Sequence, residues 1–209
     1  MKHPTKHLSE LNDNLRRANK ILNRVPANEL KTDVHELKAR AYVLLVHAAF
    51  EAYFEQLGLE AVKASRKTLK NGKISFSLVA LITSCVAAEV SEKGKKGVTE
   101  KLVRNLKTFS EEAGNQYFRI VEENHGIKNH NLKSLLLPIG VDPEEVDVAL
   151  WNSLHEFGTL RGGLAHSFKA IANEHTPSSL RSKVNGITVA IAELDKAVCN
   201  AHSVTMPVK

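Results

Sequence analysis

The chain has 209 residues, a formal net charge of +6 and 43% apolar residues. This length allows one domain with a sizeable core, and the apolar content is that of an ordinary folded protein. The two cysteines, Cys85 and Cys199, are far apart and indicate a reducing compartment instead of a disulfide framework. No Cys-x-x-Cys pair occurs, so we expect no thiolate zinc site and predict no metal or cofactor.

The basic charge favours a polyanionic partner such as a nucleic acid. No signal-peptide core follows Met1. The longest apolar run, from Ala41 to Phe54, contains His47 and Glu51 and is shorter than the roughly 20 residues that a membrane span needs. We therefore expect a cytoplasmic protein with no membrane partner.

Apolar residues at helical spacing predict a first helix over residues 5–25, ended by Pro26. A longer helix is predicted from residues 28–29 to about 70, where Asn71-Gly72 is a stop signal. Residues 77–90 predict a third helix, with 74–77 as a possible short extended piece. After a loop at 94–97, Thr99 predicts a helix to about 109, and residues 114–137 predict one or two short helices.

The run Asp142-Pro143-Glu144-Glu145 combines a capping residue, a proline at the first helical position and acids at the positive end of the dipole. It predicts the start of a long helix. Thr176-Pro177 predicts a final helix, 177–201. Alternating patterns are nearly absent, so no sheet is expected. We predict an all-α single-domain bundle, with a core at 29–175 on which the helices 5–25 and 177–201 pack.

Arg161 interrupts an apolar stripe on the long helix that starts near Asp142. The stripe has helical spacing. It consists of Leu150, Leu154, Phe157, Leu164, Phe168 and Ile171. A guanidinium in such a position requires an anion, either a carboxylate inside the fold or a phosphate from outside.

The apolar central helix carries His47 and Glu51 four residues apart on one face, and Glu55 continues the row. A carboxylate there needs a partner, and Arg161 is the obvious candidate. One interpretation is a structural Glu51–Arg161 ion pair beside a neutral His47.

Three glycines surround Arg161: Gly158, Gly162 and Gly163. Each costs about 1 kcal/mol relative to alanine inside a helix. They indicate either the close approach of a ligand or another backbone, or a break in the helix.

Arg161 and His166 together resemble the Arg-x4-His signature of the HEPN superfamily. The run Ala41–Glu55 resembles the central helix of its RiboL-PSP type, and Asn131–Val141 resembles the short helix and turn before the motif helix. The resemblance implies a metal-independent ribonuclease of toxin or antiphage type. His166 would transfer protons, Arg161 would stabilise the phosphate charge, and Glu51 would orient one of them.

Residues five apart on an ideal helix point about 140° away from each other. The resemblance resolves this divergence, because in this family two motif helices meet across a homodimer. Many active members carry Asn, Asp or His after the motif arginine, whereas this chain has Gly162. An inactive dimerisation or binding module therefore stays open as an alternative, as does an unrelated helical bundle with a structural Glu51–Arg161 pair.

Two basic stretches are candidates for binding an RNA backbone. The first has no intervening acid and is the one we select: Lys63, Arg66, Lys67, Lys70 and Lys73. The second is interrupted by Glu100: Lys93, Lys95, Lys96, Lys101, Arg104 and Lys107. The partners we expect are RNA, a second copy of the chain, and an antitoxin or defence-system protein.

Overall fold

The computed structural model describes residues 1–90, 105–166 and 175–207. Its elements follow in chain order. They are α1 (Lys6–Asn19), η1 (Lys20–Leu22), α2 (Asp33–Lys70), β1 (Lys73–Ser75), α3 (Phe76–Val90), α5 (Leu106–Glu122), α6 (Asn129–Leu136), η2 (Leu137–Ile139), α7 (Pro143–Val146), α8 (Val148–His166), α9 (Pro177–Ser203) and β2 (Thr205–Pro207). The all-α class predicted from the sequence is confirmed.

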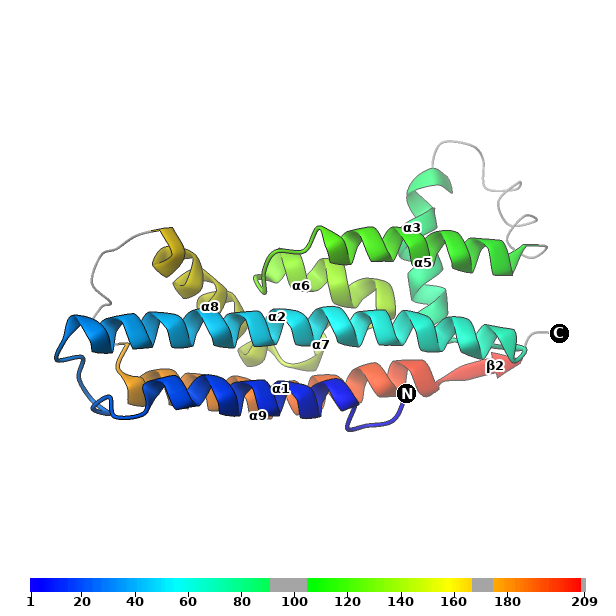
Figure 1. Ribbon diagram of the computed structural model, residues 1–209. Helices are drawn as coiled ribbons and strands as arrows, with labels where there is room; N and C mark the ends of the chain where they lie inside the picture. Colours follow the sequence, from blue (N-terminus) through cyan, green and yellow to red (C-terminus); the bar gives the residue numbers. More distant parts are fainter. Residues whose placement is uncertain (91–104, 167–174, 208–209) are drawn as a thin grey trace.

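Helix α2 is the axis of the fold. At 38 residues it is about 57 Å long, and Figure 1 shows it extending through the molecule with α1 and α9 along one side and α5, α6 and α8 along the other. The Thr32 side chain caps its first turn by accepting a hydrogen bond from the His35 N–H, 3.2 Å. Buried apolar residues on several faces of α2 contact these neighbours, as expected for a central helix.

The apolar side chains form one continuous cluster that includes Leu8 of α1 and Val198 of α9. The prediction of a single domain with a core at 29–175 agrees with this continuity but stays a prediction. None of the helices in the described ranges is long and apolar enough to cross a membrane.

Several predicted boundaries were wrong. The first helix ends at Asn19 and continues as a single 3-10 turn to Leu22, not to residue 25. Helix α2 begins at Asp33, because Thr32 is its cap and the chain before it is irregular. The helix expected to end near 109 instead extends from Leu106 to Glu122, and its predicted start at 99–104 lies outside the described residues.

The prediction that the chain contains no sheet was also wrong, because the structure has one small two-stranded sheet. Strand β1 pairs antiparallel with β2, with Ile74 opposite Met206. The extended alternative for residues 74–77 is thus partly confirmed, at 73–75. The partner strand lies more than 120 residues away in the chain, so no local pattern could signal the pairing.

Two aspartates divide the helix that was predicted to start at Asp142. The Asp142 side chain accepts from the Glu144 N–H at 2.9 Å and caps only the four-residue α7. Asp147 then leaves the helical conformation, with φ −163° and ψ 104°. Its Oδ1 accepts from the N–H groups of Ala149 and Leu150 at 2.8 and 3.0 Å, which starts α8.

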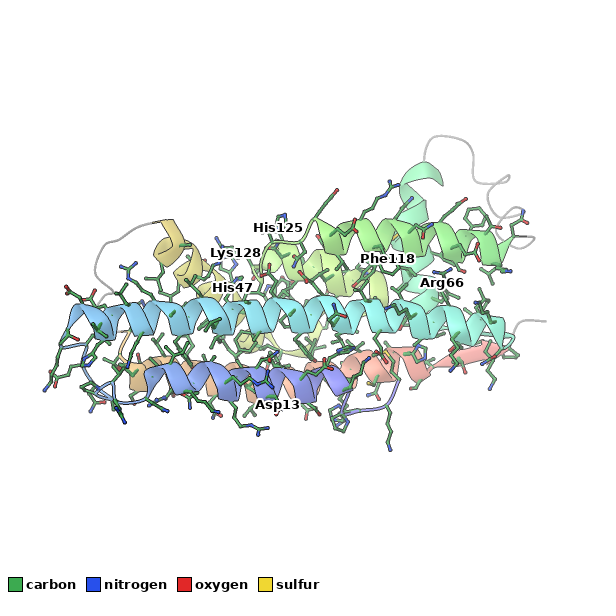
Figure 2. All side chains as sticks on the ribbon, viewed as in Figure 1. Asp13, His47, Arg66, Phe118, His125 and Lys128 are labelled. Atoms are coloured by element: carbon green, nitrogen blue, oxygen red, sulfur yellow. The ribbon has the colours of Figure 1, made fainter. Side chains whose placement is uncertain are left out.

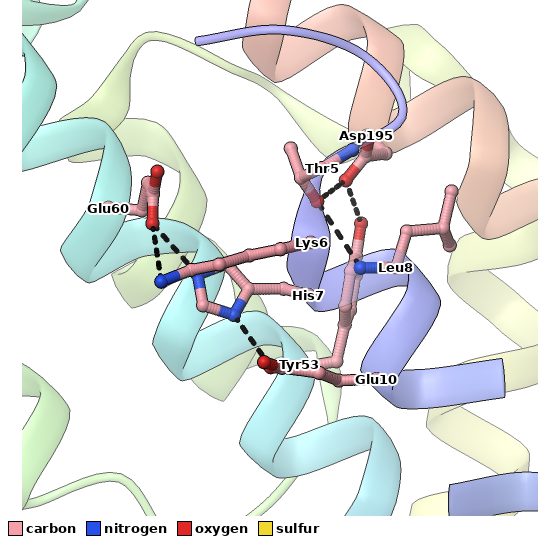
Figure 3. A network of polar contacts seen from close by, with 8 residues as sticks. All are labelled: Thr5, Lys6, His7, Leu8, Glu10, Tyr53, Glu60 and Asp195. Carbon is pink, nitrogen blue, oxygen red and sulfur yellow. Dashed lines mark hydrogen bonds and ion pairs between the residues drawn. The ribbon is translucent and has the colours of Figure 1, made fainter. Parts of the chain in front are cut away.

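Polar contacts tie the start of the chain to α9 (Figure 3). The fully buried Asp195 accepts hydrogen bonds from the Thr5 N–H (3.0 Å), the Thr5 hydroxyl and the Tyr53 hydroxyl (3.1 Å). Its Oδ2 also lies 2.8 Å from Nδ1 of His3. These contacts fix the entry to α1 against α2 and α9.

Candidate active site at the crossing of α2, α8 and the α5–α6 connector

An aromatic contact sets the position of Arg161 relative to α2. The rings of Phe50 and Phe157 are both fully buried and meet edge to face, with centroids 5.8 Å apart. Such a pair adds about 0.5–1.5 kcal/mol beyond its area burial. Arg161 lies one turn beyond Phe157, and His47 and Glu51 lie within one turn of Phe50. The packing of two phenylalanines therefore brings the misplaced charges into one region.

Helix α8 is continuous from Val148 to His166, so of the two alternatives for the glycines a break in the helix is wrong. Near its end, the Arg40 Nη1 donates to the Leu164 carbonyl at 3.4 Å. Phe168 and Ile171, the last two residues of the predicted stripe, lie outside the described residues. The same is true of the His166 side chain, although its backbone is the last described residue of α8.

The three glycines have different surroundings. A Cβ at Gly158 would lie 3.1 Å from Cγ of Lys128 and 3.4 Å from Cγ1 of Ile127, so this glycine permits a close approach by the connector. At Gly162 and Gly163 a Cβ would meet no atom within 4 Å among the described residues. Packing within the described part of the chain therefore accounts for Gly158 and not for the other two.

His47 is almost completely buried, at 3% exposure. Burial, aided by the positive charge of Arg161, lowers the pKa of His47 to about 4. The imidazole is consequently neutral at pH 7, as the structural interpretation expected. Its Nδ1 lies 3.6 Å from Oε2 of Glu51, one turn further along α2.

Glu51 is surrounded by both signs of charge. Burial and the neighbouring Glu55 raise the pKa of Glu51, while Arg161 and His125 act in the opposite direction. Across the described part of the chain, however, no direct ion pair joins Glu51 to Arg161. The expected Glu51–Arg161 pair is thus replaced by a longer-range interaction, and the guanidinium keeps its hydrogen-bonding capacity for another group.

Glu55, which continues the row of His47 and Glu51 on α2, contacts the connector between α5 and α6. Its Oε1 accepts from Nδ2 of the buried Asn124, 2.7 Å away. This bond anchors the connector between α5 and α6 to α2. At its other end the connector contacts α8, where the Asn129 N–H donates to Nδ1 of His155 at 3.5 Å.

The connector residues were missed by sequence reasoning. His125 acts electrostatically on Glu51, and Lys128 lies over Gly158. Figure 2 places His47, His125 and Lys128 together between α6 and α8, on the same side of α2. Loop residues have no periodicity that would reveal them, and the glycine at position 158 was the only available signal of a close approach there.

The first basic stretch lies elsewhere on α2. Lys63, Lys67 and Lys70 are exposed, and Arg66 is half-buried near Glu111 of α5, 4.0 Å away. From helix geometry these four residues fall within about 100° of the helix surface. Lys73 is exposed in β1. The only member of the second stretch in the described ranges is Lys107.

No group of three or more His, Cys, Asp or Glu side chains within the described ranges has the arrangement of a metal site.

All the residues of the candidate site lie within the segment that one family model matches. The family model RiboL-PSP-HEPN matches residues 8–200, which include most of α1, the central helix, Arg161, His166 and most of α9. The chain belongs to the RiboL-PSP-HEPN family. The match extends beyond the 30–170 segment on which the resemblance was based, so the first and last helices are part of this HEPN domain. The third interpretation, an unrelated helical bundle, is wrong.

No curated protein and no solved structure matches the chain. Membership of the HEPN family supports a nuclease or RNA-related role.

Proposed function

We propose that this HEPN domain is a metal-independent endoribonuclease. The observation that carries the proposal is the state of Arg161, a half-buried guanidinium at the head of the Arg-x4-His motif. Among the described residues it has neither a hydrogen bond nor an ion pair, so its donors are available to an external phosphate. A guanidinium is well suited to this ligand because its planar donors match phosphate oxygens.

In the proposed reaction the ribose 2′-oxygen attacks the adjacent phosphorus, and the bond from phosphorus to the 5′-oxygen breaks. The 2′-hydroxyl loses its proton to a base, and the departing 5′-oxygen gains one from an acid. The products are a 2′,3′-cyclic phosphate and a free 5′-hydroxyl. His166 is the proposed proton-transfer residue, and Arg161 is proposed to stabilise the charge that develops on the phosphate.

Glu51 is proposed as a positioning residue. Its carboxylate lies 3.6 Å from the neutral His47. Arg161 acts on it electrostatically, but no direct ion pair joins the two among the described residues. Its negative charge favours one orientation of the guanidinium while leaving the donors unbound. His47 supports Glu51 from the buried side.

The proposed site is shared by two copies of the chain. Because α8 is continuous, positions 161 and 166 of one protomer are about 140° apart around the helix axis. In a symmetric dimer, His166 of one protomer faces Arg161 of the other. The open surroundings of Gly162 and Gly163 support this arrangement, since a facing helix or RNA strand would occupy that space.

The basic face of Lys63, Arg66, Lys67, Lys70 and Lys73 is proposed to bind the RNA backbone away from the cleavage point. A groove of about 220 Å³ runs beside it between α2 and the start of α5 and is lined by Arg66, Lys70 and Lys107. A defence or toxin role in the cytoplasm, with an antitoxin or defence-system partner, completes the proposal.

The test is cleavage of single-stranded RNA by the purified full chain in EDTA. We expect products with cyclic phosphate ends, and we expect His166→Ala to abolish cleavage while circular dichroism and thermal unfolding stay unchanged. His130→Ala is the matched control, because His130 is exposed on α6 and has no role in the proposed reaction. Equal cleavage by wild type and His166→Ala would contradict the proposal.

The second candidate is a catalytically inactive dimerisation or binding module. Gly162 favours it, because a glycine after the motif arginine supplies no polar contact. Under this alternative, RNA stays intact after prolonged incubation although sedimentation detects a dimer.

A further inference from the structure

The described residues include eight half-buried lysine or arginine side chains, and two of them differ from the rest. Six have a hydrogen-bond or ion-pair partner inside the chain. These are Lys38 with the Asn23 carbonyl, Arg40 with the Leu164 carbonyl, Arg66 with Glu111, Lys133 with Glu144, Arg181 with Asn19, and Lys183 with Glu156. Lys128 and Arg161 have no such partner in the described part of the chain.

The two cations without partners lie close to the same part of α8. Arg161 belongs to this helix, and Lys128 packs against it from the connector. Lys128 passes over Gly158, with its Cγ 3.1 Å from the position of a Cβ there. Arg161 follows Gly158 by three residues, and such neighbours are about 5–6 Å apart on a helix surface. The stem of Lys128 therefore crosses α8 at Gly158, about one turn before Arg161.

The nearby carboxylates already interact with other side chains. Glu51, which acts electrostatically on Arg161 without contacting it, lies 3.6 Å from Nδ1 of His47, and Glu55 accepts a hydrogen bond from Asn124. His125 also acts electrostatically on Glu51. Lys128 also precedes α6, whose first turn has no side-chain cap and directs its positive dipole end toward the same region.

A partly desolvated cation without a counter-charge is unfavourable, and two adjacent ones repel each other. Proteins retain such an arrangement where an anion from outside completes it. A single phosphate at Arg161 satisfies one of the two. A strand with phosphates at regular intervals satisfies both.

We infer that Lys128 binds the RNA phosphate next to the one held by Arg161, so that the connector and α8 together grip two consecutive phosphates of one strand. This inference rests on the proposed ribonuclease function and adds a residue outside the Arg-x4-His motif. It also assigns a purpose to Gly158, which allows the lysine stem to cross the motif helix.

The experiment measures binding of a fluorescent single-stranded RNA by the full chain in a His166→Ala background, over a series of KCl concentrations. Each phosphate contact on a single strand contributes about −0.7 to the slope of log Kobs against log[salt]. We expect Lys128→Gln to make the slope less steep by about 0.7 and to weaken binding about fivefold to tenfold at low salt.

Lys133→Gln is the matched control. It removes the same charge from a half-buried lysine five residues away, but this lysine is already paired with Glu144 at 2.9 Å. We expect it to leave the slope at the His166→Ala value. Circular dichroism and sedimentation of the three proteins establish that fold and assembly are equal.

Two outcomes separate the possible failures. RNA binding with the same slope for Lys128→Gln and the control would overturn the assignment of Lys128 and leave the proposed function intact. No RNA binding by His166→Ala, even at the lowest salt, would overturn the proposed function together with this inference.

Discussion

Two regions of the molecule each contain a charged side chain that is at least partly buried, and the surroundings of the two side chains differ. Asp195 of α9 is completely buried and has close contacts with both donors of Thr5 and with Tyr53, which Figure 3 draws, and a fourth with His3. Arg161 of α8 is half-buried and has no hydrogen bond or ion pair among the described residues. One charge is enclosed by internal donors, whereas the other is left available.

The difference distinguishes a charge that stabilises the fold from one that is available to the proposed phosphate ligand. A buried carboxylate satisfied on all sides fixes the elements that supply its donors, here the first turn of α1, α2 and α9. A half-buried guanidinium that has no hydrogen-bond acceptor or counter-charge inside the fold contributes little to the free energy of unfolding. Its free donors are useful only to a molecule that arrives from outside.

The largest expected effect comes from replacing Arg161. Arg161→Met should lower RNA cleavage by at least about 100-fold, because it removes the donors for the developing phosphate charge. Its free energy of unfolding should stay within about 1 kcal/mol of wild type. Urea unfolding and initial cleavage rates measure the two effects separately.

Arg181→Met provides the matched arginine. Arg181 is equally half-buried but donates to Asn19 Oδ1 at 2.7 Å, so we expect a loss of about 1–2 kcal/mol in stability and unchanged cleavage. If Arg161→Met destabilises the protein as much as Arg181→Met does, the contrast between the two kinds of charge fails.

Replacing Asp195 should affect stability alone. Asp195→Ala leaves three buried donors of Thr5 and Tyr53 without an acceptor, so we expect a loss of about 3–5 kcal/mol in the free energy of unfolding. Cleavage per folded molecule should not change. Asp13→Ala, at an exposed carboxylate paired with Arg16, should stay within about 0.5 kcal/mol of wild type. Equal losses in the two variants would contradict the assignment.

Acid should reveal the buried His47. Its pKa is depressed to about 4 in the folded protein, below its ordinary value of 6.5, so the stability that its neutral form contributes is complete above pH 6.5. It is lost as the pH falls from 6.5 toward 4. His47→Gln removes this dependence, so wild type should lose about 2 kcal/mol more than the variant between pH 7 and pH 4.

Urea titrations at several pH values test this expectation, and His130→Gln, at an exposed position, should follow wild type. If the free energy of unfolding changes with pH in the same way for wild type and His47→Gln, burial of this imidazole does not contribute to the pH dependence of stability.

The smallest effects are expected at two open glycines. Neither Gly162 of α8 nor Gly186 of α9 has an atom within 4 Å of an added Cβ in the described part of the chain. Alanine at either position should therefore raise stability by up to about 1 kcal/mol in thermal or urea unfolding.

Only Gly162→Ala should lower cleavage, since only Gly162 faces the proposed shared site. Wild-type cleavage by both variants would indicate that the space beside Gly162 has no occupant in the active assembly.

Much of the fold was predictable because its signals are local. Thr176 and Pro177 announce α9, and Asn71-Gly72 ends α2 where expected, with Gly72 at a φ of +73°. The start of α8 was not predicted, because the Asp142 signal is strong and the second cap at Asp147 carries no proline or acidic turn behind it. The β1–β2 ladder joins distant segments and has no local pattern.

The site was predictable where a residue type contradicts its position. Arg161 in an apolar stripe and Glu51 in an apolar helix both pointed to the region where α2 and α8 cross. The direct pair between them was wrong, because periodicity gives the face of a helix and not the distance to a partner. Asn124, His125 and Lys128 lie in an irregular connector, where only the tertiary structure shows which helix they meet.

The unbroken course of α8 has a genetic consequence. If each active centre takes its arginine from one protomer and its histidine from the other, two inactive variants can complement each other. In a mixture of Arg161→Met and His166→Ala protomers, every heterodimer contains one centre with both native residues. Random re-association would then restore about one quarter of wild-type cleavage. A centre built within a single chain would stay silent in the same mixture.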